Sequence, residues 1–174
     1  MNRRTAVRNI IIISAGASLL PGCVSSTEET PLYLKHVQLT ASQQKMLAEL
    51  TETIIPKTNN FTGAKDLKTE EFVLVMVDDC ASPEDQNAFT TGMKAFEDAC
   101  KKKFNSGFAK CTAQQRVELL KELETKDEKD EAARFYHAVK GLTIQNFTSS
   151  KEYLLDVVKW KLVPGSNFKG CVPV

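Results

Sequence analysis

Apolar residues recur at helical spacing through most of this chain, and this periodicity limits the fold more than any other feature. The pattern defines five segments, at residues 40–55, 68–79, 82–103, 112–123 and 131–146. A short sixth helix is expected within residues 153–160, and the residues after it should form an irregular C-terminal tail. We therefore predict an all-α fold, a single small domain of five or six helices.

Local signals agree with these helix starts and stops. Thr40 and Thr112 each precede a glutamine by three residues, which is the spacing of a capping box. Ser82 and Pro83 have the form of an N-cap followed by a proline at the first helical position. Pro56 disfavours the helical conformation at the residue before it, so the first helix should end there.

Two places in the pattern leave alternatives open. Residues 72–77 are rich in β-branched and aromatic side chains, so a strand is the local alternative to a helix. We prefer the helix because every neighbouring segment is helical. Gly141 lies inside the fifth helix, where it is expected to allow either a close helix contact or a bend.

The first 22 residues have the pattern of an export signal. Arg3, Arg4 and Arg8 form a positive start, and an apolar run at residues 10–20 follows. As a helix this run reaches about 16 Å, which is too short for the ~30 Å hydrocarbon layer of a membrane. Arg3 and Arg4 resemble the twin-arginine motif, which exports folded cargo; a Sec signal with two ordinary arginines is the alternative.

Residues 20–23, Leu-Pro-Gly-Cys, resemble a lipobox, so we expect Cys23 to be acylated and to become the new N-terminus. The expected organisation is a signal peptide at 1–22, a lipid-anchored polar tether at 23–38 and a helical domain at 39–174. This places the domain on the periplasmic side of a bacterial membrane, held there by its lipid.

The charge balance argues against a nucleic-acid partner. The chain has 23 basic and 22 acidic residues, and the signal holds three of the basic ones, which leaves 20 minus 22, or −2. Nucleic-acid binding needs a net basic face. The one local basic run, Lys101 to Lys103, falls at a predicted helix C-terminus, where cations suit the helix dipole.

Four cysteines follow Cys23, and an even number in an exported chain suggests disulfides. Cys100 and Cys111 flank the link between two predicted helices and form the first candidate pair, worth about 3 kcal/mol by loop entropy. Cys80 and Cys171 then remain as the second candidate pair. A metal site is the rival interpretation, and the absence of a Cys-x-x-Cys motif disfavours it.

Residue types that carry catalysis are scarce. The sequence lacks the motifs of covalent haem, dinucleotide, P-loop, zinc-protease and serine-hydrolase sites. Of the two histidines, His36 lies near the tether and His137 has only Arg134 and Lys140 at helical spacing. The neighbours Asp78 and Asp79 point apart on a helix, so we expect them to hydrate a helix end. We therefore expect no catalytic residue, bound cofactor or metal in this chain.

Several short stretches of the chain resemble a known family. They include residues 53–56 (Thr-Ile-Ile-Pro), 140–143, 146–149, 163–165 and 168–173. Together with the Arg-Arg signal, they are similar to the gluconate 2-dehydrogenase subunit 3 family, from about residue 3 to residue 173.

This resemblance implies a non-catalytic small subunit that stabilises and escorts a periplasmic FAD-dependent dehydrogenase of the glucose–methanol–choline type. The partner would oxidise a sugar, sugar acid or polyol, and a multihaem cytochrome c subunit often completes the membrane complex. FAD and haem would then belong to the partner subunits. Trp160 and Phe168 are candidate interface anchors, with local packing as the equal alternative. The competing function is a stand-alone envelope lipoprotein that binds another protein and has no redox role.

Overall fold

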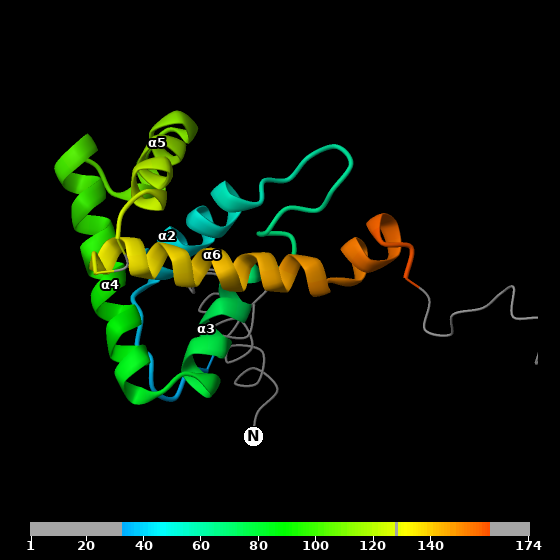
Figure 1. Ribbon diagram of the computed structural model, residues 1–174, viewed down its shortest axis with the longest axis horizontal. Coiled ribbons are helices and arrows are strands. Elements are labelled where there is room, and N and C mark those ends of the chain that lie inside the picture. The colour runs from blue at the N-terminus through cyan, green and yellow to red at the C-terminus, as the bar shows by residue number, and fades with distance from the viewer. Residues whose placement is uncertain (1–32, 128, 161–174) are drawn as a thin grey trace, which may run out of the picture. The chain divides into compact units, whose positions relative to one another are not determined.

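The computed structural model describes residues 33–127 and 129–160, and these residues form an all-α domain, as predicted (Figure 1). Its helices are α2 (Ala41–Ile54), α3 (Thr69–Cys80), α4 (Pro83–Phe104), α5 (Ala113–Glu124) and α6 (Glu131–Ser149). Two short turns accompany them, the 3-10 turn η1 (Phe108–Lys110) and the π-helical turn η2 (Tyr153–Val157). Residues 72–77 lie within α3, so the strand alternative is wrong. Arg3, Arg4, Cys23, Phe168 and Cys171 lie outside the described residues.

The predicted helix caps form. Thr40 and Thr112 complete capping boxes at the starts of α2 and α5. The hydroxyl of Ser82 accepts a hydrogen bond from the backbone N–H of Asp85, and Pro83 is the first residue of α4. α6 ends at Ser149, three residues beyond the predicted 146. The caps therefore place helix starts well, because they satisfy backbone N–H groups that a helix leaves unpaired.

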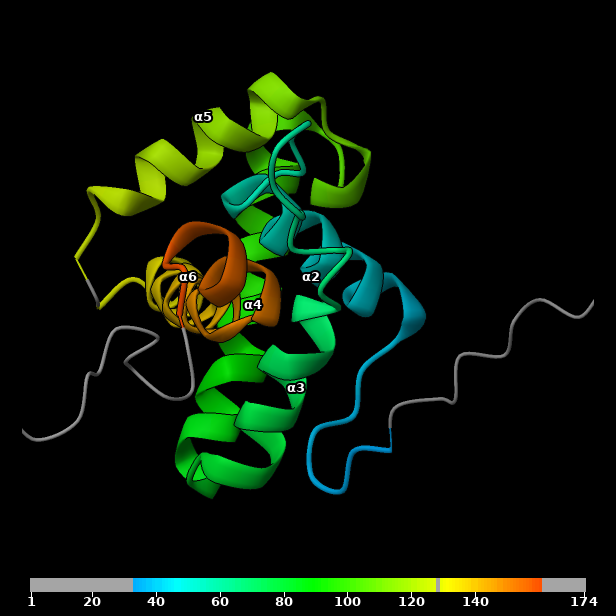
Figure 2. The ribbon, with the colours of Figure 1, turned by 90° about the vertical axis from the view of Figure 1, so that its right-hand side faces the viewer.

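The core centres on the crossing of α4 and α6, which Figures 1 and 2 show from two sides. The Phe135 ring of α6 lies 5.0 Å from that of Phe89 and 5.5 Å from that of Phe96, between ring centroids. A Cβ on Gly92 would lie 2.8 Å from both the Glu131 carbonyl oxygen and the Phe135 Cβ. The two helices approach this closely because Gly92 has no side chain.

Gly141 has no such role. A Cβ placed on Gly141 meets nothing within 4 Å, and the residue is exposed. The expectation of a close helix contact at this position is therefore wrong, and Gly92 makes that contact instead. α6 also continues as one helix through Gly141 to Ser149.

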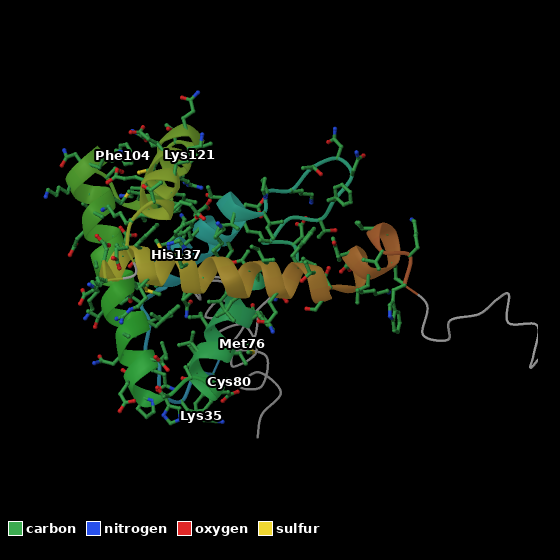
Figure 3. The ribbon with its side chains drawn as sticks, viewed as in Figure 1. Lys35, Met76, Cys80, Phe104, Lys121 and His137 are labelled. Carbon is green, nitrogen blue, oxygen red and sulfur yellow. The ribbon has the colours of Figure 1, made fainter. Side chains whose placement is uncertain are left out.

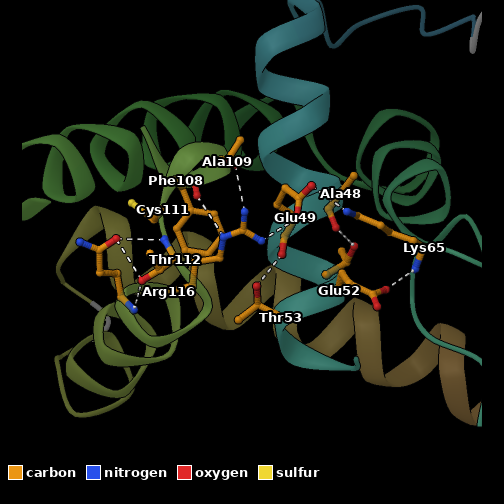
Figure 4. Close-up of polar contacts among 12 residues, drawn as sticks. Ala48, Glu49, Glu52, Thr53, Lys65, Phe108, Ala109, Cys111, Thr112 and Arg116 are labelled. Atoms are coloured by element: carbon orange, nitrogen blue, oxygen red, sulfur yellow. Dashed lines mark hydrogen bonds and ion pairs between the residues drawn. The ribbon is translucent and has the colours of Figure 1, made fainter. Parts of the chain in front are cut away.

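The loop between α2 and α3 is held by one carboxylate of α2. Glu52 accepts hydrogen bonds from the backbone N–H groups of Lys57 and Lys65, each at 2.9 Å. Figure 4 shows the bond to Lys65. Ile55 leaves the helical region with φ of −128° and ψ of 86°, as the following proline requires. Its carbonyl then accepts a hydrogen bond from the N–H of Ala64 at 2.9 Å. The loop is therefore closed by the Glu52 carboxylate and by one backbone hydrogen bond.

A second carboxylate joins α2 to α5. Glu49 pairs with Arg116, whose other nitrogens donate to the carbonyls of Phe108 and Ala109 at 3.2 and 2.9 Å (Figure 4). The Lys65 side-chain nitrogen (Nζ) lies 2.7 Å from Oε1 of the same Glu49 carboxylate. Partial burial alone would raise the pKa of Glu49, but the hydrogen bonds and charges of Lys65 and Arg116 outweigh it and lower that pKa. The ionised carboxylate therefore stabilises the junction of α2, η1 and α5.

Within residues 33–127 and 129–160, none of the helices combines the length and the hydropathy that crossing a bilayer requires.

Candidate partner interface

In the part of the chain that the structure describes, the side chains that bind metals are dispersed. Among the described residues, no three side chains of the His, Cys, Asp and Glu types gather as a metal site. The His137 ring packs beside that of Tyr136, with centroids 5.3 Å apart. Tyr136 in turn is hydrogen-bonded to Glu124, which also pairs with Lys140. These contacts stabilise the face between α5 and α6.

Asp78 has a role that sequence reasoning missed. Its side chain is only 4% exposed, and its carboxylate accepts backbone N–H bonds from Lys35, His36 and Val37 at 2.7–2.8 Å. The expectation that Asp78 hydrates a helix end is therefore wrong. Burial alone would raise the pKa of Asp78, but the three N–H bonds outweigh burial and lower it. The carboxylate thus binds residues 35–37 to the end of α3.

The sequence does contain a signal for this role of Asp78. Asp78 follows Leu74 by four residues, so it shares the buried face of α3 with that leucine. A carboxylate on a buried helix face needs hydrogen-bond donors, which here come from a segment about 40 residues earlier. The adjacent Asp79 is exposed, and its carboxylate pairs with the Lys35 side chain at 3.3 Å. Of these two neighbours, only Asp78 is buried.

The structure brings the first candidate cysteine pair together. The sulfur atoms of Cys100 and Cys111 lie 3.4 Å apart, and both residues are buried. Both are free thiols here, so the covalent bond stays a prediction. Burial and the neighbouring Cys111 raise the pKa of the Cys100 thiol. Cys80 is a free thiol exposed at the end of α3, and its predicted partner Cys171 lies outside the described residues.

Large apolar side chains gather in the open around η2. The Tyr153 ring packs on the Phe147 ring, with centroids 5.2 Å apart, and so attaches η2 to the end of α6. Lys159 adopts a left-handed φ of 56°, which turns the chain so that the Trp160 N–H donates to the Leu154 carbonyl at 2.8 Å. The exposed residues, which we call the η2 platform, are Leu155 (45%), Val157 (42%), Val158 (51%) and Trp160 (48%).

The platform has the character of a contact surface. Fully burying a valine or leucine side chain is worth about 1.5–3 kcal/mol, so a cluster left in water gains free energy when a partner covers it. The exposure of Trp160 agrees with its choice as a candidate interface anchor. Other large apolar side chains are also exposed in the described domain, among them Phe61, Val117 and Ile144.

A separate apolar groove of about 350 Å³ opens between α3, α4 and α6. Its apolar lining includes Met76, Phe89, Phe135 and Leu142, and Cys80 lies at its edge. Figure 3 shows Met76 and Cys80 on successive turns of α3. A larger groove of about 640 Å³, between the start of α2 and the end of α4, has mixed basic and acidic walls. Mixed walls of this kind do not select for a ligand of one charge.

Comparison with known proteins identifies a family. A family model described as gluconate 2-dehydrogenase subunit 3 matches residues 41–165. The match begins at the first residue of α2 and continues through η2 and the whole platform. Neither the curated proteins nor the solved structures contain a match to this chain.

Proposed function

The chain belongs to the gluconate 2-dehydrogenase subunit 3 family, and from that membership we propose that it is the non-catalytic small subunit of an FAD-dependent dehydrogenase complex. The large partner holds the FAD and oxidises a sugar, sugar acid or polyol. A multihaem cytochrome c subunit is a further partner and holds the haem. This chain stabilises the large subunit and escorts it through export.

The η2 platform is the observation that supports a binding role most directly. It presents four large apolar side chains in one short segment, and these are held in place by the Phe147–Tyr153 contact and the turn at Lys159. Because the segment is fixed before binding, a partner that covers it orders few additional side chains. A subunit whose function is to bind another protein has a use for such a surface.

The N-terminal signals extend the proposal to location. Arg3 and Arg4 direct twin-arginine export, which carries the folded dehydrogenase together with this chain. Acylated Cys23 then holds the complex on the periplasmic side of the membrane. Asp78 binds residues 35–37 of this N-terminal segment to the end of α3.

Immunopurification of the chain from detergent-solubilised membranes of its source organism tests the proposal. We expect FAD fluorescence in the acid-denatured eluate, and dye-linked dehydrogenase activity with one of a panel of sugars, sugar acids and polyols. An eluate that contains the chain without flavin or dehydrogenase activity would favour the stand-alone lipoprotein function instead.

Two matched substitutions locate the binding surface. Val157 on the platform and Val117 on α5 are each 42% exposed, and Figure 1 shows α5 and η2 at opposite ends of α6. We expect Val157→Asp to lower co-purified flavin at least tenfold, since a buried unpaired charge costs more than the ~1.4 kcal/mol that a tenfold change requires. Val117→Asp should leave the flavin yield unchanged. Equal yields from the two variants would remove the platform from the proposal.

A charge-conserving substitution tests the export route. Replacing both arginines (Arg3→Lys with Arg4→Lys) keeps the positive start that a Sec signal needs but removes the twin-arginine pair. We expect the chain and the flavoprotein to remain together in the cytoplasmic fraction. Normal export of both proteins would contradict the twin-arginine route. Cys23→Ser should release the exported chain from membranes into the soluble periplasmic fraction.

A further inference from the structure

The apolar groove between α3, α4 and α6 has one free thiol at its edge. Cys80 ends α3 and is exposed, while Met76 one turn earlier lines the groove. Phe89, Phe135 and Leu142 form the opposite walls from α4 and α6. The groove also has one acid and one base, Asp85 and Arg134, so its charge does not select an occupant. Its apolar lining favours a segment with apolar side chains.

The other cysteines leave Cys171 as the natural partner of Cys80. Cys100 and Cys111 are buried and face each other at 3.4 Å, so neither is available to an exposed thiol. Cys23 is the lipobox cysteine, and acylation would modify its sulfur, so that this sulfur could not form a disulfide. The residues before Cys171 include Leu162, Val163 and Phe168, and residues 161–174 have no acidic side chain.

The chain between Trp160 and Cys171 is long enough to reach Cys80. Its eleven peptide steps (171 minus 160) span up to about 36 Å when extended. The Asn146 side chain donates to the Thr69 hydroxyl at 2.9 Å, which places the end of α6 beside the start of α3. From Thr69 to Cys80 the helix rises about 17 Å. Running along α3 uses about 17 of these ~36 Å, which leaves about 19 Å of extended chain for the step from Trp160 to the start of α3.

We propose that residues 161–171 fold back along α3 into this groove and that Cys171 forms a disulfide with Cys80. The two thiols lose two protons and two electrons to a disulfide donor, either a thiol–disulfide oxidoreductase or oxidised glutathione. The thiolate of one cysteine displaces one thiol of the donor and forms a mixed disulfide. The second cysteine's thiolate then attacks the first cysteine's sulfur and releases the other donor thiol, so the donor ends as two thiols.

This disulfide would fix η2 at its C-terminal end as well as at its N-terminal end. The segment is already attached to α6 through Tyr153, and the disulfide would attach the chain beyond Trp160 to α3. The proposal concerns this chain alone and does not depend on the partner dehydrogenase.

Peptide mapping of the full chain tests the bond. The reduced protein is refolded with a mixture of oxidised and reduced glutathione, alkylated, and digested with trypsin without reduction. Trypsin cuts after lysine and arginine, so Cys80 lies in the peptide of residues 69–94 and Cys171 in that of residues 170–174. We expect these two peptides to be joined. Peptide 170–174 with an alkylated cysteine, or joined to any other peptide, would overturn the proposal.

Two single substitutions serve as controls for the mapping. Cys171→Ser should leave Cys80 fully alkylated and abolish the joined product. Cys111→Ser should leave the 69–94 and 170–174 product intact, because it removes only the partner of Cys100. Loss of the product in Cys111→Ser would show that the two pairs exchange partners, contrary to the proposed pairing.

Alkylation kinetics test docking in the groove without the covalent bond. The rate of Cys80 modification is compared between Cys171→Ser and a chain that ends at residue 160, with Cys100 and Cys111 replaced by serine in both. A docked tail shields Cys80, so we expect the rate in Cys171→Ser to be at least tenfold lower. Equal rates would refute docking, even if the disulfide were found.

Discussion

Large apolar side chains make up both the crossing of α4 and α6 and the η2 platform. They are buried at the crossing and exposed on the platform. At the crossing, the rings of Phe89 and Phe96 pack against the ring of Phe135, and all three are buried near Gly92. On the platform, Trp160 and three aliphatic side chains lie open to solvent, although backbone and ring contacts fix the segment that carries them. Apolar side chains that already pack against each other stabilise this fold, whereas those left exposed on an ordered segment are available to a partner.

The largest loss of stability should follow from removing a buried ring at the crossing of α4 and α6. Phe96 is fully buried and packs against Phe108 and Phe135. Phe96→Ala removes those contacts and leaves a cavity, so we expect the free energy of unfolding to fall by about 3–5 kcal/mol. Urea denaturation followed by circular dichroism measures this change. A loss below about 1 kcal/mol would mean that the crossing repacks freely, and the contrast between the two regions would then weaken.

A glycine pair on the crossing helices should give the next largest effect. Gly92→Ala places a Cβ at 2.8 Å from a backbone oxygen and from another Cβ, so α4 and α6 must separate. We expect the free energy of unfolding to fall by about 1–3 kcal/mol. Gly141→Ala is the matched control, because it enters open space and should stabilise α6 by about 0.5–1 kcal/mol. Effects of the same sign in both variants would disprove the close approach at Gly92.

A smaller, pH-dependent loss of stability is expected when Asp78 is replaced. Asp78→Asn presents an amide nitrogen without a lone pair to the N–H groups of residues 35–37, so Tm at pH 7 should fall by several degrees. The folded-state pKa of Asp78 is lowered. The carboxylate's contribution is therefore fully present above the unfolded pKa near 4, and is lost as pH falls through the folded pKa.

The Tm difference between wild type and Asp78→Asn should accordingly be constant above about pH 6 and shrink below about pH 4. Thermal melts across this range measure it. The exposed neighbour provides the control, since Asp79→Asn removes only a solvent-exposed ion pair with Lys35 and should leave Tm unchanged. A difference between wild type and Asp78→Asn that grows on acidification would contradict a lowered pKa for Asp78 in the folded protein.

The smallest effect on stability should come from the platform. Trp160→Ala removes an exposed ring, so the free energy of unfolding should change by less than about 1 kcal/mol. Urea denaturation of the isolated chain measures this change. If the platform is a partner surface, the same variant should still lower the yield of co-purified flavoprotein in the immunopurification. A stability loss as large as that of Phe96→Ala would show that Trp160 belongs to the core.

The sequence predicts the helices well because their signals are local. The capping side chains of Thr40, Ser82 and Thr112 bind backbone groups within three residues of themselves. The spacing of apolar residues within one helix likewise shows which face of that helix is buried. The proximity of Cys100 and Cys111 is also predictable, since only a short link separates them.

The errors concern contacts between segments far apart in the chain. Gly92 and Gly141 both lie inside helices, and only the position of a second helix distinguishes a close contact from open space. Asp78 was expected in solvent because its hydrogen-bond donors are about 40 residues earlier, in a segment without helical periodicity. No local pattern identifies such pairs.

The three hydrogen bonds at Asp78 also have a mechanical consequence. Any tension along the N-terminal segment reaches residues 35–37 before it reaches the first turn of α2. The load therefore passes to the end of α3, where Gln86 of α4 binds the carbonyls of Asp78 and Ala81. A pull on the chain before residue 35 is thus shared by α3 and α4, and it does not reach the capping box of α2 first.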